Sequence, residues 1–378
     1  MDQCADMCDI AHPPVSARSA PLVPRMARLA VFLRERPQRF VTSISSVLIV
    51  DDEPAVRDLM SRWVAALGMR AATAANADEA LATLRSGRYD LAVVDVLMPG
   101  HDGLWLAAEM QRDHPYTAVI IATAYTELLG PDAQQPDIAD LLVKPFQRDR
   151  FALALERGRQ WRKQALEELQ WHAVLSKELR ERTDELCGQL NASADQSPAV
   201  EWLTAVMAKR APSALEHGTR VARYSVAVAR EMSLDREAID ELELAARFHD
   251  VGKAAMPDAL LTKPSPLAPG EKAIMRRHVE AGAEILGCAP ALASIAPIVL
   301  ASHEWFGGGG YPRKLTGVAI PLASRIIAVV DAYDSMLDAG RDRVSAEPAG
   351  AVSELLRCGG TQFDPEALTA FLAVLGRH

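Results

Sequence analysis

Short, continuous apolar runs alternate with amphipathic segments in the first part of the chain. Residues 47–50 and 91–94 are uninterrupted apolar runs, and further strands are expected at 118–121 and 140–143. Residues 54–68 and 77–87 show the helical spacing of apolar positions, and each segment ends at a glycine. Continuous apolar runs are typical of parallel strands that are buried on both faces. Alternating strands and helices therefore predict an α/β fold with a doubly wound parallel sheet.

The middle of the chain predicts one long helix. Residues 157–191 contain no proline and are dense in Glu, Arg, Lys, Gln and Leu, which are good helix formers. Eight positions of this segment follow a heptad frame: Ala165, Leu169, His172, Ser176, Leu179, Thr183, Leu186 and Leu190. The frame favours a parallel coiled coil that joins two subunits. Its polar members leave a second possibility open, a solvated helix that packs on its own neighbours.

The last part of the chain shows helical spacing without strand alternation. Residues 193–198 break the chain, and helices are expected at 200–209, 217–232, 236–250, 269–286, 290–304 and 321–337, followed by a terminal pair. This pattern predicts an all-α bundle. We therefore expect a multidomain chain with a flexible tail (1–44), an α/β domain (45–157), a helical connector (158–197) and a helical domain (198–378).

Composition limits the classes of function. The chain has 378 residues, 49% of them hydrophobic and 24% charged, as in globular proteins with more than one domain. A net charge of -9 argues against a DNA-binding surface. The five cysteines are scattered and odd in number, which predicts no disulfide framework and favours the cytoplasm. No apolar run is long enough for a membrane span.

Acidic residues follow two of the predicted strands. Asp51 and Asp52 come directly after the first run, and Asp95 follows the second. The carboxyl ends of neighbouring parallel strands meet at one edge, so these carboxylates should converge and bind Mg²⁺. Thr123 and Lys144 close the next two strands and could hold the oxygens of a phosphoryl group.

This constellation resembles the receiver domain of two-component systems. The motifs that carry the resemblance are Asp51-Asp52, Asp95, Met98-Pro99, Asp102-Gly103, Thr123-Ala124 and Lys144-Pro145. The resemblance implies phosphorylation of Asp95 by a histidine kinase, a Mg²⁺ site at Asp51 and Asp52, and a phosphate switch at Thr123 and Lys144. One position departs from the pattern, because Leu141 stands where the family usually has an aromatic residue.

The helical part contains residues of the kind that bind metals. His249 and Asp250 are adjacent at the end of an apolar helix, and His278, His303 and Asp331 follow in the same domain. Neighbouring imidazole and carboxylate groups suit a pair of divalent metals, which activate water for hydrolysis. The pattern therefore predicts a metallohydrolase.

The helical part also resembles the HD-GYP family. The resemblance is carried by the motifs His217, His249-Asp250-Val251-Gly252-Lys253, His278, His303-Glu304, Gly310-Tyr311-Pro312, Asp331 and Phe363-Asp364-Pro365. It implies a cyclic di-GMP phosphodiesterase with iron or manganese bound by His217, His249, Asp250, His278, His303 and Asp331. It further implies that Lys253 offsets phosphate charge beside Asp250, that Tyr311 shapes the nucleotide pocket and that Arg343 contacts phosphate.

Several positions depart from the HD-GYP pattern. Ser302 replaces the first of two consecutive histidines, and Ser213 stands where three-metal members have a glutamate, so at most two metals are expected. Gly307 and Gly340 fall in segments that are usually Asp-Gly and Arg-Pro-Tyr-Arg. These departures support an alternative function, a catalytically degenerate domain that binds a nucleotide or a protein partner.

Overall fold

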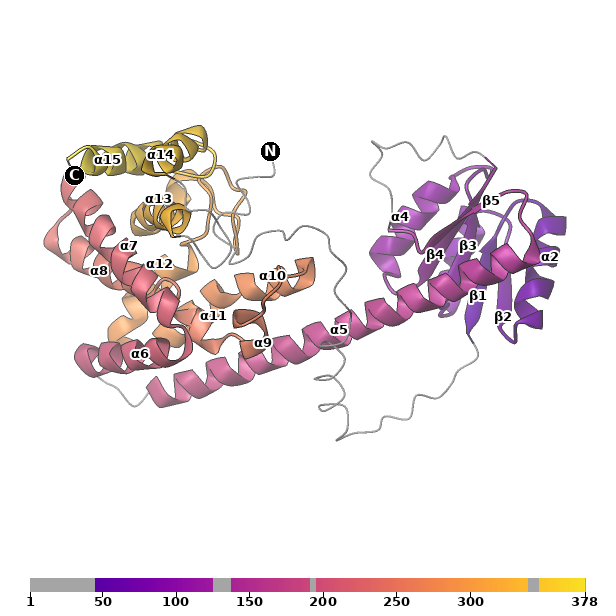
Figure 1. Cartoon of the computed structure of the whole chain (residues 1–378), viewed down its shortest axis with the longest axis horizontal. Helices are drawn as coiled ribbons and strands as arrows, with labels where there is room; N and C mark the ends of the chain where they lie inside the picture. Colours follow the sequence, from indigo (N-terminus) through magenta and orange to yellow (C-terminus); the bar gives the residue numbers. More distant parts are fainter. Residues whose placement is uncertain (1–44, 125–136, 191–194, 339–346, 378) are drawn as a thin grey trace. The chain divides into compact units, whose positions relative to one another are not determined.

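The computed structural model describes residues 45–124, 137–190, 195–338 and 347–377. The predicted tail (1–44) and Arg343 lie outside these residues. The described chain divides into two compact units that meet within one helix, between Trp171 and His172. Figure 1 follows the chain through both units, which are described separately below.

The first unit is built on a five-stranded parallel sheet with the order β2-β1-β3-β4-β5. The strands are β1 (Ser46–Val50), β2 (Arg70–Ala74), β3 (Leu91–Asp95), β4 (Ala118–Thr123) and β5 (Asp140–Val143). β1 lies between β2 and β3, and Leu48 is paired with Ala72 on one side and Ala92 on the other. The predicted parallel sheet is confirmed. The edge strand β2, with the sequence RAATA, has no continuous apolar run and was not predicted.

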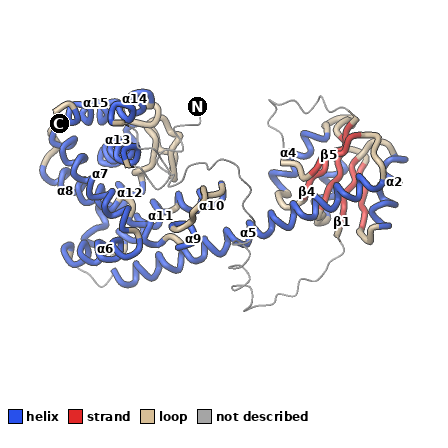
Figure 2. Tube along the Cα trace, in the orientation of Figure 1, coloured by secondary structure: helices blue, strands red, loops and turns tan. Residues whose placement is uncertain are grey.

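Helices cover both faces of this sheet, as Figure 2 shows. They are α2 (Pro54–Ala66), α3 (Ala77–Ser86), α4 (Gly103–Asp113) and the beginning of α5 (Arg148–Leu190). Leu48 and Val94 pack with Leu84 of α3 and Leu106 of α4. The strand residues that alternate with these point to the other face of the sheet. There, Ile49 and Val93 pack with Met60 of α2 and Phe151 of α5 in a second core. This two-sided core explains why the strands are apolar at every position.

Helix α5 is longer than the predicted connector, because it runs without a break for 43 residues. Its first turns belong to the core of the sheet, where Phe151 and Leu155 are fully buried. Gly158 allows α5 to lie close to β3, since a Cβ there would come within 2.5 Å of Leu91 Cδ2. The helix predicted from residue 157 therefore starts nine residues earlier, as the last helix of the α/β unit.

The second unit is helical, as predicted. After the end of α5 it contains α6 (Gln196–Arg210), α7 (Pro212–Glu231), α8 (Arg236–Phe248), η3 (Val251–Ala255), α9 (Asp258–Leu261), α10 (Pro269–Arg276), α11 (His278–Gly287), η4 (Pro290–Ile295), α12 (Ala296–Leu300), η5 (Gly317–Ala319), α13 (Leu322–Leu337), α14 (Pro348–Arg357) and α15 (Pro365–Leu375). Helices α7, α8 and α13 pack together and carry much of the buried core.

Two predicted helices are divided in the structure. Residues 269–286 form α10 and α11, which are separated at Arg277, and residues 290–304 form η4 and α12, which ends at Leu300. The first division places His278 at the start of α11, directly against η3. The two backbones are so close that a Cβ at Gly252 would lie 1.9 Å from the His278 carbonyl oxygen. This close approach depends on tertiary packing, which helical periodicity does not report.

The second half of α5 packs on its own chain. Leu179, Thr183, Leu186 and Leu190, which were predicted to face a partner helix, are buried within the helical unit. The coiled-coil prediction is therefore wrong for these four positions, and the alternative of packing on neighbouring helices holds there. His172 also packs inward, because a Cβ at Gly270 would lie 2.0 Å from its ring.

One cysteine pair contradicts the prediction of unpaired thiols. Cys187 near the end of α5 and Cys288 after α11 form a disulfide, with their Cα atoms 5.4 Å apart. The two residues are separated by 101 positions in the sequence. Only the packing of α5 against α11 brings them together, so their spacing in the sequence carried no signal.

Candidate metal centre

Six predicted ligands form two adjoining groups in the helical unit. His217 of α7, His249 after α8 and Asp331 of α13 have donor atoms within 4.8 Å of one another. The second group contains Asp250, His278 and His303, again within 4.8 Å. His249 and Asp250 are neighbours in the chain, so the segment that follows α8 contributes one residue to each group. The structure thus brings all six residues together, as predicted.

Backbone carbonyls fix the orientation of two of these imidazoles. His249 Nδ1 lies 2.8 Å from the Ala246 oxygen, and His278 Nδ1 lies 2.9 Å from the Met275 oxygen. A carbonyl can only accept, so each Nδ1 carries a proton, and Nε2 is the nitrogen available to bind a metal. His249 Nε2 faces Asp250 Oδ2 at 3.6 Å, and His278 Nε2 faces Asp250 Oδ1 at 3.2 Å.

A cation between these groups would satisfy them. Asp250 Oδ1 is buried and has no hydrogen bond of acceptable geometry among the described residues. His278 Nε2 also lies 3.2 Å from His303 Nε2, although both are the nitrogens expected to bind a metal. Acceptor atoms that face one another in a buried site repel unless a proton or a metal lies between them. The donor set, imidazole and carboxylate, suits iron, manganese or zinc.

Asp250 is held in its charged form by its surroundings. Burial raises the pKa of this carboxyl, but the nearby positive charge, that of Lys253 first, outweighs burial and holds the pKa well below its usual range. Lys253 lies in η3 with Nζ 2.6 Å from Asp250 Oδ2, and its side chain is 29% exposed. The lysine therefore sits at the open side of the site, where an anionic substrate can reach it.

His217 is bound on both sides by carboxylates. Its Nε2 lies 2.8 Å from Asp331 Oδ1, and its Nδ1 lies 2.7 Å from Asp334 Oδ2. Burial lowers the pKa of His217, but the hydrogen bonds to Asp331 and Asp334 raise it to about 10. Asp334 is held in turn by the guanidinium of Arg220, with contacts of 2.8–3.0 Å.

Asp334 is a candidate supporting residue that was not predicted from the sequence. A carboxylate on the outer nitrogen of a metal-binding histidine orients the ring and raises its basicity. The sequence contained one hint of this role, because Asp334 follows Asp331 by three residues and therefore lies on the same face of α13. Its partner His217 is on another helix, so spacing alone did not reveal the pair.

The Gly-Tyr-Pro loop packs on the second ligand group. The Tyr311 ring is stacked on His303 with centroids 5.2 Å apart, and Arg276 lies 5.2 Å from the same ring. Gly310 allows this approach, because a Cβ there would lie 2.2 Å from the Trp305 nitrogen. The Glu304 carboxylate accepts hydrogen bonds from two loop amides, those of Arg313 and Leu315. Tyr311 thus supports a predicted ligand directly.

Ser302 stands where the family pattern has a histidine, but its hydroxyl does not point to the ligand groups as a substitute ligand would. Its hydroxyl is buried and donates to the Val299 oxygen at 2.8 Å. The hydroxyl is therefore engaged with the end of α12. The second group keeps three protein ligands, and three ligands leave coordination positions open for substrate and water.

The α/β unit carries the predicted acidic edge. Asp51, Asp52 and Asp95 have carboxylate oxygens within 4.8 Å of one another. Lys144 Nζ lies 2.8 Å from Asp51 and 3.1 Å from Asp95. Burial raises the pKa of Asp95, while the nearby Lys144 opposes the increase. Thr123 is buried at the end of β4, and its carbonyl oxygen accepts from the Lys144 amide at 2.8 Å, so all five predicted residues lie at this edge.

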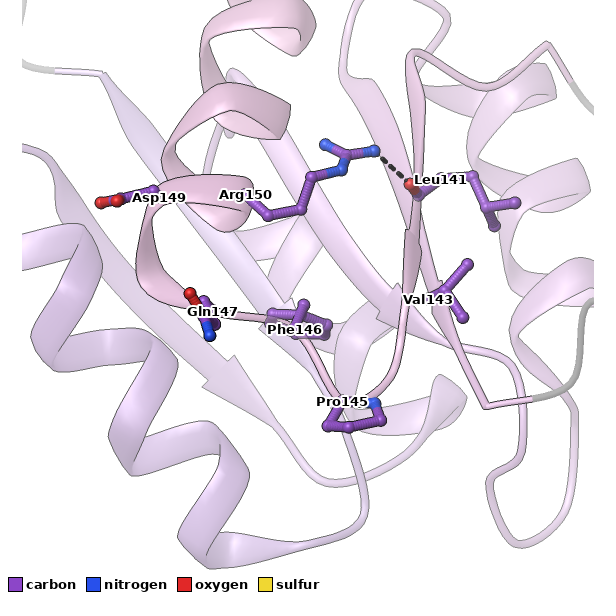
Figure 3. A pocket seen from close by; sticks show the side chains of 7 residues that line it. All are labelled: Leu141, Val143, Pro145, Phe146, Gln147, Asp149 and Arg150. Carbon is purple, nitrogen blue, oxygen red and sulfur yellow. Dashed lines mark hydrogen bonds between the residues drawn. The ribbon is translucent and has the colours of Figure 1, made fainter.

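The unusual Leu141 lines a surface pocket beside this edge, shown in Figure 3. The Arg150 guanidinium donates to the Leu141 oxygen at 2.5 Å and is paired with Asp140 at 2.7 Å. Val143 and Phe146 line the same pocket. At position 141 itself, an aliphatic side chain therefore lines this pocket where the family usually has an aromatic residue.

Two family models match the chain. The model described as a response regulator receiver domain matches residues 47–156, and the model described as an HD domain matches residues 201–367. An acidic parallel-sheet domain and a helical domain with paired ligand groups define a regulator with a metal-dependent hydrolase as its output. Within the described residues, no helix is both long and apolar enough to cross a membrane.

Similar proteins extend over nearly the whole chain. The cyclic di-GMP phosphodiesterase response regulator RpfG of Xanthomonas campestris is 31% identical over 86% of this chain and 87% of its own length. A cyclic di-GMP phosphodiesterase of Thermotoga maritima is 29% identical over 86% and 89%. A 3'3'-cGAMP-specific phosphodiesterase of Vibrio cholerae is 37% identical over 41% of this chain and 30% of its own length. The chain belongs to the family of response regulators that join a receiver domain to an HD domain.

Proposed function

We propose that the chain is a response regulator that hydrolyses cyclic di-GMP to the linear dinucleotide pGpG, or further to GMP. The observation that carries this proposal is the pair of adjoining ligand groups joined through His249 and Asp250. The full-length relatives named as cyclic di-GMP phosphodiesterases support the choice of substrate.

The six ligands suit two divalent metals, iron or manganese. His217, His249 and Asp331 would hold one metal, and Asp250, His278 and His303 would hold the other. Bound metals at such a site act as Lewis acids on a phosphoryl group and activate water. Asp250 reaches both groups, since its two oxygens face His249 and His278.

Other residues of this chain bind and orient the substrate. Lys253 is partly exposed beside Asp250, and its ammonium group can offset the negative charge that develops on the phosphate. Tyr311 bounds the nucleotide pocket from the side of His303. Arg343 remains a predicted phosphate contact outside the described residues.

Phosphorylation of Asp95 by a histidine kinase would control this activity. Asp51 and Asp52 provide the Mg²⁺ ligands, and Lys144 already contacts two of the carboxylates. Thr123 at the end of β4 completes the phosphate contacts. The nucleotide substrate and a phosphate donor of this kind are consistent with action in the cytoplasm.

A homodimer through the connector remains part of the proposal, over a shorter stretch than the heptad frame suggested. Leu169 of the frame is 41% exposed, whereas the later heptad leucines are buried. An exposed leucine on a long helix favours pairing with a second copy. We expect the contact around Leu169.

The test is turnover by the purified full-length chain with Mn²⁺ or Fe²⁺. We expect hydrolysis of cyclic di-GMP, and a loss of at least about 100-fold in Asp250→Asn, which loses the charge shared by both groups. Cyclic GMP-AMP should be assayed in parallel because one relative is specific for it. Turnover of that nucleotide alone would contradict the proposed substrate.

A degenerate domain that binds a nucleotide or a protein without catalysis is the second candidate. The engaged hydroxyl of Ser302 favours it, because the second group has lost one expected nitrogen ligand. Elemental analysis separates the candidates. Less than one metal per chain, with no turnover while RpfG hydrolyses the substrate in parallel, would support the degenerate domain.

A further inference from the structure

Two arginines from different helices donate hydrogen bonds to the backbone of the segment that follows Lys253. Arg182 of α5 donates through Nη1 to the Met256 oxygen at 2.7 Å. Arg210 of α6 donates to the same oxygen at 3.2 Å and, through Nε, to the Ala254 oxygen. Both guanidinium groups also contact the Asp258 carboxylate, at 3.1 and 3.0 Å.

The two kinds of contact differ in strength. Asp258 is 66% exposed, so its ion pairs are screened by water and contribute little. Met256 is fully buried, and a buried carbonyl that accepts from charged donors is costly to leave unsatisfied. The carbonyl contact is therefore the one that fixes the segment.

The segment that contains Met256 is connected directly to the candidate metal centre. The Met256 amide donates to the Lys253 oxygen at 3.1 Å, so the two residues belong to one tight turn. Lys253 contacts Asp250, and Gly252 lies against the backbone of His278. A shift of the Met256 carbonyl would move this turn and change the position of the Lys253 ammonium group.

Arg182 and Arg210 lie on different helices, and only the helix of Arg182 extends into the receiver. Arg210 ends α6, inside the helical unit. Arg182 is on α5, the unbroken helix whose first turns form part of the receiver core through Phe151 and Leu155. Farther along α5, Arg162 is paired with Asp90 of the receiver at 2.8 Å. A movement of α5 caused by the receiver would therefore reach Met256 through Arg182.

We propose that Arg182 is a positioning residue that couples the connector helix to Lys253. Its contact with the Met256 carbonyl transmits the state of the receiver to the turn that carries the lysine. This inference rests on the proposed function where it is tested by turnover of cyclic di-GMP. A second measurement, hydrogen exchange, does not depend on turnover. Glu178 supports the arrangement by holding the Arg182 guanidinium at 2.7 Å.

The experiment compares full-length Arg182→Gln with Arg180→Gln, an exposed arginine on the same helix. Turnover of cyclic di-GMP, metal content and thermal midpoint are measured with and without beryllofluoride, which mimics the phosphoryl group on Asp95. We expect Arg180→Gln to keep the wild-type response. Arg182→Gln should bind metal normally, show an unchanged KM and a kcat lower by on the order of tenfold, and lose the response to beryllofluoride.

Hydrogen exchange of residues 251–258 provides the readout without catalysis. We expect beryllofluoride to change the exchange of this segment in the wild type and in Arg180→Gln, but not in Arg182→Gln. Arg182→Lys, which keeps one charged donor, should retain part of the response if the glutamine variant folds poorly. A wild-type response that persists in both Arg182 variants would overturn the proposal, as would a wild-type segment that never responds. Absence of turnover with an intact exchange response would contradict only the proposed function.

Discussion

At the scale of single residues, the candidate metal centre is organised by groups outside the six proposed ligands. The Ala246 and Met275 carbonyls accept from Nδ1 of His249 and His278, and Asp334 accepts from Nδ1 of His217 and orients its ring. Each hydrogen bond directs Nε2 toward the carboxylates of the site. The ligand geometry is therefore set before any metal arrives, which lowers the cost of binding.

Replacing Asp334 should weaken metal binding. Asp334→Ala removes the acceptor that orients His217, and losses of this kind lower metal affinity by about 10- to 100-fold. Competition titration with a metal chelator measures the effect. Asp338→Ala is the matched control, because Asp338 contacts Arg220 at 2.6 Å and is 56% exposed. Equal metal affinity of the two variants would contradict the role assigned to Asp334.

Metal binding should release a proton from His217. Its raised pKa of about 10 means that the metal-free imidazole is protonated at neutral pH, whereas a metal ligand must be deprotonated. Burial lowers the pKa of His249. Burial raises the pKa of Asp331, but the hydrogen bond to His217 together with the charges of the nearby histidines outweighs burial and holds that pKa below its usual range, so neither residue should release a proton. Affinity should therefore rise with pH between about 7 and 10 and level off above the pKa of His217.

Calorimetry in buffers with different ionisation enthalpies measures this release. We expect close to one proton per metal bound at the first group near pH 7.5. The same titration with His217→Ala should show weaker binding and less proton release. A binding enthalpy that is independent of the buffer would contradict the protonated state of His217.

At the scale of elements, α5 combines two structural roles in one helix. Its beginning completes the receiver core, and its end completes the helical unit through Leu179, Leu186 and the disulfide of Cys187. The heptad frame arose from residues that are buried within the chain. A helix that packs on its own domain and a helix in a coiled coil show the same apolar spacing, so periodicity could not separate them.

The disulfide should stabilise the helical unit when it is formed. It closes a loop across 101 positions, and loop-closure entropy gives about 4–5 kcal/mol for a loop of that size. Under oxidising conditions, Cys187→Ser should therefore unfold at a lower denaturant concentration than the wild type. Peptide mapping without reductant should recover the linked peptides of Cys187 and Cys288. Recovery of both as free thiols would contradict the pairing.

At the scale of the whole molecule, one continuous helix joins the unit with the proposed phosphorylation site to the unit with the candidate metal centre. Acetyl phosphate with Mg²⁺ should add one phosphoryl group to the full-length chain, seen by intact mass. Asp95→Asn should lose this label, because the amide cannot act as the nucleophile. Asp113→Asn, an exposed acid of the same unit, serves as the control. Undiminished labelling of Asp95→Asn would contradict the assignment.

Local patterns explain why much of this architecture was predictable. The strands β1, β3 and β4 are apolar at nearly every position, and Asp51, Asp95 and Thr123 stand at or just after their ends. The pair His249-Asp250 is contiguous, so it is visible without a fold. By contrast, β2 owes its strand conformation to its pairing with β1, and its own sequence has little strand propensity.

The sequence by itself predicted the two domain types and the acidic edge, because contiguous motifs and local periodicity encode them, and it predicted the six proposed metal ligands through its resemblance to the HD-GYP family. Tertiary structure decided which residues support those ligands and which helix reaches them. Asp334 meets His217, Cys187 meets Cys288, and Arg182 meets Met256 only because helices distant in sequence pack together. Such contacts depend on crossing geometry and burial, which no local pattern of side chains reports.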